Sequence, residues 1–527
     1  MKRVPIFCAL LSLAQCANIL FVTSFPSHSH QVMFQPVWKE LSLRGHNVVA
    51  ITPNPLRDES LTNLTEVDIS KVYEKIQEAR KNEDTKQWRY YLTQKPGFLT
   101  VFIKDIIMTM IFNQMHETIL NLPNMQEFLK QDHKFDVVIV EWLYPTFAAF
   151  GAKYKAPMIG ITSLGAPIPA LDTVGNPSHP VYAPDHNLPV GRDMTFRERL
   201  LSALWAFYVR ITYHTIILPR EDALARKYMG EDLPYLGDIE RNVSLLLLNR
   251  NPVFHKTMPV VPAIVELGYM KKNKSESSLN VEIKKFLDQS KNGVVYFSLG
   301  SNIMPSILPQ EVIKEIVETF RIIPYDVIFK WDQDTLENKP KNVLLTKWVP
   351  QEAVLRHKNT KLFVTQGGLQ SSDEAIINQI PIIGIPFFSD QTSNVDTMVK
   401  YGMGKVLDYS DLTVEKFSAY IKEVITDPSY KENAKKLSQL YTDQPTDALE
   451  KAVWWIEYVI RHKGASHLRS SAMDIPWYQY LMLDIFAFIS IILIVIIIIL
   501  KLIIKLFFVV FRKILYCKKY VFKNKKE

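Results

Sequence analysis

Cysteine is almost absent from this chain. Its 527 residues include only Cys8, Cys16 and Cys517, so residues 17–516 contain none. This absence excludes a disulfide-stapled scaffold and a cysteine-ligated structural zinc site in the body of the chain. Burial of apolar side chains must therefore hold the fold, and the length is sufficient for two or more domains with separate cores.

Net charge is also absent from most of the chain. The formal net charge is +8, but residues 501–527 hold nine Lys or Arg side chains against the single acid Glu527, so residues 1–500 sum to zero. A high pI that arises from one short tail indicates membrane topology and not a nucleic-acid-binding surface. We expect no nucleic-acid partner.

Both ends of the chain have the composition of targeting segments. Residues 1–17 combine a basic start, an apolar run and small residues, which is typical of a secretory signal peptide. The alternative, a buried first strand, is disfavoured because residues 18–24 already supply that strand. Residues 480–500 approach the ~20 apolar residues that a membrane-spanning helix needs, and Trp477 and Tyr478 precede them as an aromatic belt.

The basic tail sets the expected orientation. By the positive-inside rule, residues 501–527 are cytosolic and the body of the chain is lumenal. The final residues, KNKKE, resemble a dilysine retrieval signal of the endoplasmic reticulum, and ordinary juxtamembrane charge is the alternative. Sequons at Asn63, Asn242 and Asn273 fit a lumenal body. We therefore expect a single-pass type I protein of the endoplasmic reticulum membrane.

Between these ends, apolar strands alternate with helical patterns in two halves separated by a polar linker at residues 251–290. Such alternation predicts an α/β fold with parallel sheets, whose ligands bind beyond the carboxyl ends of the strands. Residues 54–130 are irregular and rich in aromatic and methionine side chains, which either line a wide apolar pocket or form core. The expected strands are residues 18–24, 47–52, 136–142, 157–162 and 243–248, then 293–300, 326–331, 342–348, 361–365 and 381–387.

The stretch of residues 348–394 is central to the second half. Gly367 and Gly368 lie where a strand turns into a helix, so backbone N–H groups and the positive helix end are available to an anionic ligand. The stretch lacks both the GxGxxG dinucleotide fingerprint and a Walker lysine. This pattern alone predicts only an anion site at a helix start.

The complete register of that stretch is more specific. It reads W-x-P-Q, then T-Q-G-G-x-x-S-x-x-E-A, then P-x-x-x-D-Q-x-x-N, and it resembles the donor-binding signature of the UDP-dependent glycosyltransferases. The resemblance extends from about residue 18 to the membrane span. It implies a GT-B fold, in which two doubly wound Rossmann-like domains face a crevice. The implied segments are an acceptor domain at 18–250, a UDP-sugar domain at 291–455, and a terminal helix and juxtamembrane segment at 456–479.

A glycosyl transfer needs a general base, and His30 is the candidate. It follows the first strand at the start of a helix, where the positive helix end favours the neutral imidazole that accepts a proton. The resemblance places the catalytic histidine at Ser29-His30, with His28 as the second choice. The family pairs this histidine with an aspartate, for which this chain has Glu141. A glutamate can still orient the ring; alternatively, Glu141 is a surface carboxylate at a strand end.

The resemblance also implies the donor contacts. Trp348 would stack on the uracil, Gln351 would contact the nucleoside, and Glu374 would accept hydrogen bonds from the ribose hydroxyls. The expected phosphate and sugar contacts come from Ser301, Gln366, Gly368, Gln370, Ser371, Asp390 and Gln391.

Gln366 is a second departure, because many family members have histidine there. Glutamine donates a hydrogen bond to phosphate but is never cationic. This form of the motif resembles the insect-type branch, in which UDP-glucose is the usual donor. Asp332-Gln333-Asp334 imitates a metal-binding D-x-D motif, but the family neutralises the diphosphate with helix ends, so we expect no metal and no cofactor.

The sequence therefore predicts transfer of a hexose from a UDP-sugar to a hydroxyl of a small lipophilic acceptor, with inversion. Glucose is favoured over glucuronate. One alternative is an impaired protein that binds UDP-sugar or a lipophile without turnover and pairs with an active partner. Another is an enzyme that glycosylates a membrane lipid. The sequence leaves open whether the chain forms homo-oligomers or hetero-oligomers.

Overall fold

A computed structural model describes residues 16–80, 97–185, 187–188, 190–191, 193–270, 279–301 and 303–523. Nearly all of the expected signal peptide, the sequon at Asn273 and the last four residues lie outside the described residues. The chain divides into two compact units, one that ends at Arg469 and one that begins at Ser470.

The first half of the larger unit contains a seven-stranded parallel sheet with the order β3-β2-β1-β4-β5-β6-β7. The chain leaves β1 toward β2 and β3 on one side, and later returns to place β4 on the other side of β1. The carboxyl ends of β1 and β4 therefore form a topological switch point. The strands are β1 (Asn18–Val22), β2 (Asn47–Thr52), β3 (Leu64–Asp68), β4 (Val137–Glu141), β5 (Met158–Thr162), β6 (Val243–Leu248) and β7 (Ile264–Glu266).

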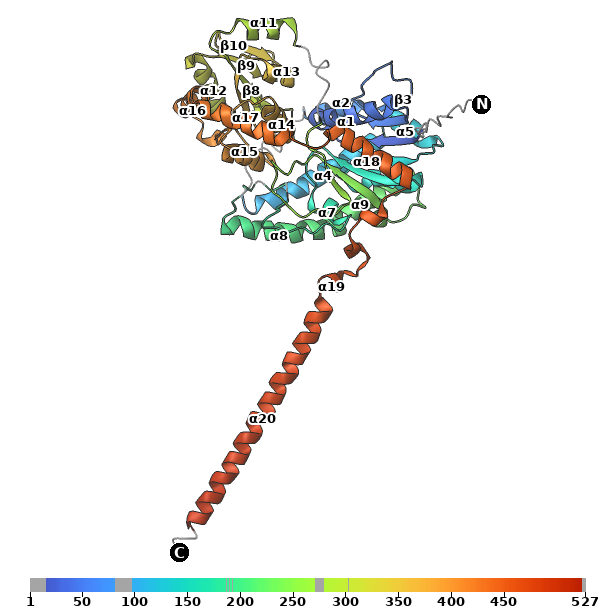
Figure 1. Ribbon diagram of the computed structural model, residues 1–527, viewed down its shortest axis with the longest axis vertical. Coiled ribbons are helices and arrows are strands. Elements are labelled where there is room, and N and C mark those ends of the chain that lie inside the picture. Colours follow the sequence, from blue (N-terminus) through green and yellow to red (C-terminus); the bar gives the residue numbers. More distant parts are fainter. Residues whose placement is uncertain are drawn as a thin grey trace, which may run out of the picture. The chain divides into compact units, whose positions relative to one another are not determined.

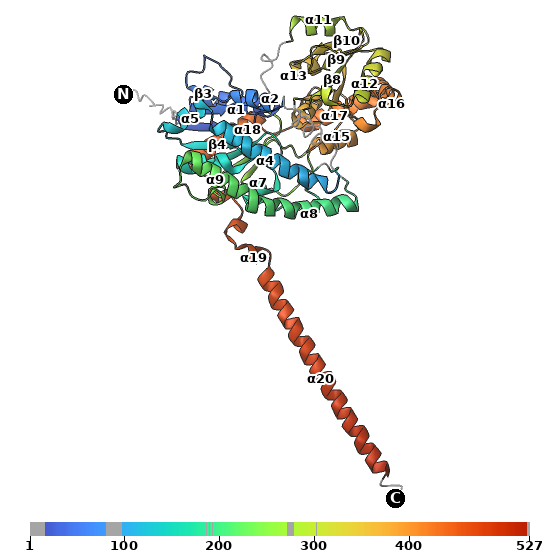
Figure 2. The same cartoon turned by 180° about the vertical axis from the view of Figure 1, so that it is seen from behind.

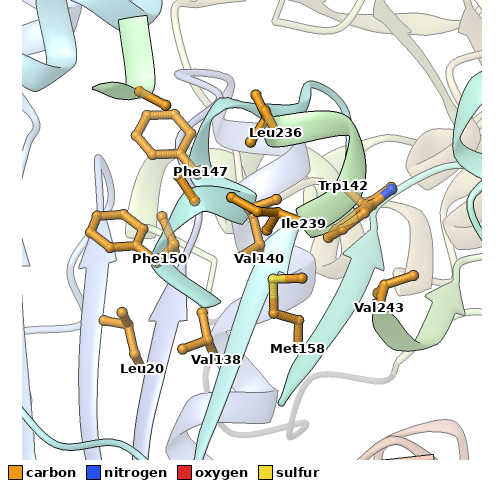
Figure 3. Close-up of a cluster of buried hydrophobic side chains, with 14 of the residues drawn as sticks. Leu20, Val138, Val140, Trp142, Phe147, Phe150, Met158, Leu236, Ile239 and Val243 are labelled. Carbon is orange, nitrogen blue, oxygen red and sulfur yellow. The ribbon is translucent and has the colours of Figure 1, made fainter. Parts of the chain in front are cut away.

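Helices cover both faces of this sheet, which is why its strands are apolar on both sides. In β1, Leu20 faces one core while Ile19 and Phe21 face the other. Figure 3 shows the first of these cores, where Val138 and Val140 lie near Phe150. The helices on that face are α4 (Thr100–Leu120), α5 (Pro123–Lys130), α6 (Ala149–Lys153), α7 (Ile168–Asp172), α9 (Leu218–Met229) and α10 (Leu236–Glu240); α1 (His28–Leu43) and α18 (Ala448–His462) cover the other.

The second half repeats this plan with a six-stranded parallel sheet of order β10-β9-β8-β11-β12-β13. Its switch point lies between β8 and β11. The strands are β8 (Val294–Ser298), β9 (Asp326–Lys330), β10 (Val343–Thr346), β11 (Thr360–Thr365), β12 (Ile382–Gly384) and β13 (Gly404–Val406). Its helices are α11 (Val281–Gln289), α12 (Gln310–Ile322), α13 (Gln351–Arg356), α14 (Leu369–Ile377), α15 (Gln391–Lys400), α16 (Val414–Thr426) and α17 (Pro428–Thr442), seen around the sheet in Figure 1. Two doubly wound halves confirm the expected α/β class.

Helix α18 departs from the expected domain boundaries. It begins at Ala448, so the boundary expected between residues 455 and 456 falls inside a helix. Ile456 and Val459 are fully buried in the core that α1 forms with the first sheet. Arg44, which follows α1, pairs with Glu457 at 3.4 Å. The last helix of the larger unit therefore belongs to the core of the first half, because its apolar stripe fills the face that α1 leaves uncovered.

The expected linker and irregular segment also contain regular structure. Strand β7 and helix α11 lie within residues 251–290, and β3, α2 (Lys71–Arg80), α4 and α5 lie within residues 54–130. The Asn63 sequon is not a free surface site: its side-chain nitrogen donates to the backbone oxygens of Ser42 and His46 at 2.8 and 2.7 Å. A glycan attaches to that nitrogen, so these contacts disfavour modification there. Asn242 is exposed.

The smaller unit contains α19 (Trp477–Tyr480) and the long helix α20 (Leu483–Lys523). Its stretch Leu483–Cys517 is long and apolar enough to cross a membrane, and none of its most apolar window is buried within the protein. The helix continues past residue 500, where the sequence predicted that the span would end. A second stretch, Phe196–Met229, passes the same test but is partly buried. It comprises α8 (Phe196–Thr212), a π-helical turn (Tyr213–Ile217) and α9.

Candidate active site

The candidate site residues lie at the two switch points. Helix α1 begins at His28 soon after β1, and Glu141 is the last residue of β4. In the second sheet, Ser301 follows β8, and Gln366 follows β11. Both sheets therefore present their candidate residues at the carboxyl ends of strands, where ligands of doubly wound sheets bind.

Two glycines shape the second switch point. Gly300 and Gly367 have φ angles of +76° and +84°, which favour glycine. A Cβ atom on Gly300 would overlap Nε2 of Gln366, and one on Gly367 would overlap Cγ2 of Val395. These turns therefore require glycine both for the backbone conformation and for the close approach of side chains.

The His30 side chain is buried and held by Ser163, which follows β5. Its Nδ1 atom lies 2.5 Å from the Ser163 hydroxyl oxygen. The ring of Phe25 packs edge-on against the His30 ring at 4.7 Å between centroids. When Nδ1–H donates to Ser163, Nε2 carries the lone pair that can accept a proton. Ser163 thus occupies the orienting position that the sequence assigned to Glu141.

Glu141 has a different environment from the one expected. It is only 2 % exposed, so it is not a surface carboxylate. Its Oε2 atom accepts hydrogen bonds from the backbone N–H groups of Ser24 and Phe25, at 3.0 and 2.9 Å, and from the side chain of Gln31 at 3.4 Å. His30 is not among its hydrogen-bond partners in the described part of the chain. Burial raises the pKa of Glu141 to about 8, against the opposing effect of these hydrogen bonds.

The start of α1 meets the second half of the unit. The rings of His28 and Trp348 are 4.6 Å apart and nearly perpendicular. The hydroxyl oxygens of Ser29 and Ser301 are 3.4 Å apart. The segment that carries His30 is therefore in direct contact with two of the residues expected to bind the donor.

Lys330, at the end of β9, is a candidate site residue that the sequence analysis missed. Its ammonium group lies 4.8 Å from the centroid of the Trp348 ring and donates to the backbone oxygen of Gly300 at 2.9 Å. Burial lowers the pKa of Lys330 to about 8. In the sequence, Lys330 could have been recognised as a charged residue at the end of an otherwise apolar strand.

A set of four residues, which we call the interdomain bridge, joins the two halves: Ser163, Asn249, Gln370 and Asp373. The backbone oxygen of Ser163 accepts hydrogen bonds from Gln370 at 2.8 Å and from Asn249 at 3.1 Å. Asn249 also donates to the Asp373 carboxylate at 3.4 Å. Burial raises the pKa of Asp373 to about 7, even though Tyr441 and Asn249 donate to the carboxylate. Gln370, expected to contact phosphate, is therefore engaged with the opposite half.

Residues expected at the nucleoside, Gln351 and Glu374, are brought together with Ser371, which was expected at the phosphates. The side-chain nitrogen of Gln351 donates to the Ser371 hydroxyl at 3.0 Å and to the Glu374 carboxylate at 2.8 Å. The side-chain oxygen of Gln351 accepts from the Tyr296 hydroxyl at 3.1 Å. The start of α13 and the first turns of α14 thus form one polar cluster.

The residues expected at the sugar lie where α15 begins. Asp390 accepts a hydrogen bond from Asn394 at 2.7 Å, and Asn394 also donates to the backbone oxygen of Gly367 at 3.0 Å. The side-chain oxygen of Gln391 accepts from the backbone N–H groups of Phe387 and Phe388. These contacts fix the loop beside the Gly-Gly turn, and they engage the oxygen of the Gln391 side chain within the protein.

The two aspartates of the D-x-D-like sequence, Asp332 and Asp334, contact groups of the protein. Asp332 accepts from the backbone N–H of Ser306 at 3.0 Å, and Asp334 pairs with Lys347 at 2.6 Å. In the described parts of the chain, no group of three or more His, Cys, Asp or Glu side chains is arranged to hold a metal ion.

Two Rossmann-like halves, with a buried histidine at the switch point of the first and a Gly-Gly helix start at the switch point of the second, are typical of a glycosyltransferase of the GT-B class. Residues 19–521 match the family described as UDP-glucoronosyl and UDP-glucosyl transferase, and the chain belongs to this family.

Its relatives include insect, viral and mammalian proteins. The chain is 35 % identical over 496 residues to UDP-glycosyltransferase UGT5 of Dactylopius coccus, an alignment that covers 92 % of this chain and 91 % of the relative. It is 31 % identical over 513 residues to an ecdysteroid UDP-glucosyltransferase of Spodoptera littoralis nuclear polyhedrosis virus, covering 92 % and 96 %. It is 31 % identical over 472 residues to UDP-glucuronosyltransferase 1A6 of Mus musculus, covering 88 % and 87 %.

Solved structures share the fold. The glycotransferase of kitacinnamycin aligns with a TM-score of 0.56 at 18 % identity, covering 85 % of this chain and 100 % of that one. The glycosyltransferase VinC, in complex with DTDP, aligns with a TM-score of 0.54 at 15 % identity, covering 84 % of this chain and 100 % of VinC. The family and the fold agree, so the protein is an enzyme that transfers a sugar from a UDP-sugar.

The buried carboxyl group of Glu141 predicts a pH-dependent stability. Because its pKa rises from 4.5 to about 8 on folding, the folded state retains a proton there that the unfolded chain releases. The contribution of this proton to the free energy of unfolding is fully present below pH 4.5. It is lost as the pH rises through about 8, by up to about 1.4 kcal/mol per pH unit. Glu141→Gln, a neutral side chain of the same shape, should therefore gain stability relative to the parent as the pH rises from about 5 to about 8.

Thermal unfolding of the detergent-solubilised full chain at these two pH values measures this difference. Asp136→Asn is the control, because Asp136 precedes the same strand but its contact with the Asn18 backbone is exposed. A difference between Glu141→Gln and the parent that does not change with pH would contradict the assignment.

Proposed function

We propose that the enzyme transfers a hexose, with glucose favoured over glucuronate, from a UDP-sugar to a hydroxyl of a small lipophilic acceptor, with His30 as the general base. The observation that carries this proposal is the position of His30. Its ring is held by Ser163, while the neighbouring His28 and Ser29 contact Trp348 and Ser301. A base in the first half and the donor elements of the second half thus meet at one place.

The proposed reaction is a single displacement. Nε2 of His30 accepts the proton of the acceptor hydroxyl, and the acceptor oxygen attacks the anomeric carbon from the face opposite UDP. The bond from that carbon to the diphosphate oxygen breaks, and its electron pair leaves with UDP. Attack opposite the leaving group inverts the anomeric centre. Ser163 keeps the ring oriented by accepting from Nδ1–H.

On the donor side, we assign the uracil to the exposed face of Trp348 and the nucleoside to the cluster of Gln351, Ser371 and Glu374. The diphosphate would lie at the start of α14, near Gly368 and Ser301, where backbone N–H groups and the helix end favour an anion. Lys330 supplies the positive charge that Gln366 cannot have. The sugar would contact Asp390 and the side-chain nitrogen of Gln391. No cofactor or metal takes part in this assignment.

The surroundings of His30 favour a lipophilic acceptor. Phe25 packs against His30, and Phe112 of α4 lies 5.4 Å from Phe25 between ring centroids. Phe112 in turn stacks on Tyr144 at 4.4 Å. A row of aromatic rings beside the base provides apolar contact area for a ring system or alkyl chain.

The donor preference and the location are further parts of the proposal. Glucose is supported by the TQGG form of the motif and by the similarity to the proteins from Dactylopius coccus, one of which is described as a UDP-glucosyltransferase. We propose that α20 spans the endoplasmic reticulum membrane, with a lumenal body and a cytosolic basic end. The uncharged residues 485–500, followed by Lys501 and Lys505, support this orientation.

The first experiment compares His30→Ala with His28→Ala. Membranes that contain the full chain are supplied with UDP-glucose, UDP-glucuronate or UDP-galactose and a panel of phenols and alcohols, and UDP release is measured. Loss of the general base should reduce turnover by about 10²- to 10⁴-fold. His28→Ala should retain most of the activity. If His28→Ala is the more impaired variant, His28 is the base.

Ser163→Ala tests the positioning role. It removes the hydroxyl that holds the ring but leaves the backbone oxygen that binds Gln370 and Asn249. We expect kcat to fall by about 10- to 100-fold through lost orientation, with little change in the KM for UDP-glucose. Ser163→Thr, which retains a hydroxyl, should recover a large part of the activity. Equal activity of Ser163→Ala and the parent would exclude this role.

Lys330 predicts a pH dependence of donor binding. Since its pKa is lowered to about 8, the charge that attracts the diphosphate disappears as the pH rises above that value. The KM for UDP-glucose in the parent should increase by up to about tenfold over roughly one pH unit above this pKa. Lys330→Arg, whose guanidinium stays charged, should remove most of this increase. The same increase in both proteins would show that Lys330 does not bind the donor.

A further inference from the structure

The exposed large apolar side chains of the larger unit are unevenly distributed. Among its described residues, six lie within residues 98–111 and eight within residues 181–216, whereas the rest of the unit has nine. Single exposed apolar residues are normal, but a concentration of this kind marks an interaction surface.

Helix α8 carries most of the second group on one face. Phe196, Leu200, Phe207 and Ile211 are spaced so that they form a single stripe. Phe196 and Phe207 are each 71 % exposed, and Ile211 is 62 % exposed. Trp205, on another side of the helix, is buried. The helix is therefore packed on the protein by one face and presents an apolar stripe with the other.

The amino-terminal part of α4 lies beside α8 (Figure 2). The ring of Phe102 is 5.7 Å from that of Trp205 and 4.8 Å from that of Tyr208, whose hydroxyl donates to the Phe102 backbone oxygen. Ile103 and Met110 of α4 are 49 % and 53 % exposed. We call the exposed apolar side chains of these two helices the α4–α8 face.

The exposed charges along the two helices have one sign. Between residues 97 and 114, no charged side chain is exposed. Along α8, the exposed Lys, Arg, Asp and Glu side chains are Arg197 and Arg199. Apolar side chains accompanied by arginines complement a surface with an apolar interior and anionic headgroups.

The chain itself places this unit near such a surface. Residues 470–482, which join the unit to α20, could extend to at most about 45 Å, and they contain a helical turn and α19, which shorten them. If α20 spans a bilayer, as proposed above, the unit cannot move farther from the bilayer than this tether allows.

We propose that the α4–α8 face rests in the headgroup region of the bilayer that holds α20. This inference depends on the proposed membrane span, and it adds a second contact between the protein and the lipid. The stretch Phe196–Met229 is long and apolar enough to cross a membrane, but 28 % of its most apolar window is buried in the protein. A helix packed in this way lies along the interface and does not cross it.

This placement also concerns the acceptor. Farther along α4, Phe112 contacts Phe25, which packs against His30. A lipophilic molecule dissolved in the bilayer would therefore meet the same helix at the lipid surface and beside the base.

A lipid-quenching experiment on the full chain tests the contact. Because residues 17–516 lack cysteine, replacing Cys8, Cys16 and Cys517 with serine leaves no thiol. Phe207→Cys then introduces one on the α4–α8 face, and Val281→Cys, at a residue that is 85 % exposed on α11, provides the matched control. Each protein is labelled with a polarity-sensitive fluorophore and reconstituted in phosphatidylcholine–phosphatidylserine vesicles.

We expect lipids brominated on their acyl chains to quench the label at position 207 and to leave the label at position 281 unchanged. Replacing phosphatidylserine with phosphatidylcholine should weaken the quenching. An unquenched label at position 207 would overturn the inference, as would disulfide cross-linking between two unlabelled Phe207→Cys chains in place of quenching.

Washing the vesicles with alkaline carbonate separates a failure of this inference from a failure of the proposed membrane span, on which it rests. Extraction of both labelled proteins from the vesicles would show that α20 does not span the bilayer. That result would overturn the inference together with the proposed topology, while the His30 mechanism would remain intact.

Discussion

The hydrogen bonds of Ser163 are the interaction on which the candidate active site depends. Its hydroxyl contacts His30, and its backbone oxygen accepts from Gln370 and Asn249. One residue thus fixes the orientation of the proposed base and joins the first half to the helix that carries the donor residues. The arrangement couples two requirements of glycosyl transfer, a correctly oriented base and a correctly placed donor, because a displacement of the halves would disturb both.

Three buried ionisable groups border the candidate active site. Glu141, Lys330 and Asp373 come from different strands and helices. Burial shifts the pKa of each in the direction that favours the uncharged side chain. Such groups destabilise the fold unless neighbours satisfy them, and they are common at functional sites. Here Glu141 stabilises the loop before α1 through two backbone N–H groups. Glu141 therefore holds the segment that leads to His30 and does not contact the imidazole ring through a hydrogen bond.

The local pattern of the sequence was sufficient for much of this architecture. Apolar runs predicted most of the strands. The resemblance to the UDP-dependent glycosyltransferases implied that Gln351 and Glu374 would both lie at the nucleoside, and their side chains are 2.8 Å apart. Ser163, Asn249, Lys330 and Asp373 were missed because their roles arise from contacts across long sequence separations. The resemblance implied a terminal helix but not which sheet α18 covers. Helix α20 continues to Lys523, past Lys501 and Lys505, which set the expected end of the membrane span.

The packing of α18 on the first sheet has a consequence for how the chain acquires its structure. The first half is discontinuous in sequence, since the core shared by Phe34, Trp38 and Ile456 is complete only when residues on both sides of the second half are present. During synthesis, the part of this face that α18 covers stays exposed until the ribosome has made the entire second half. The second half has no such dependence, so the later-made half can reach its final packing before the earlier one.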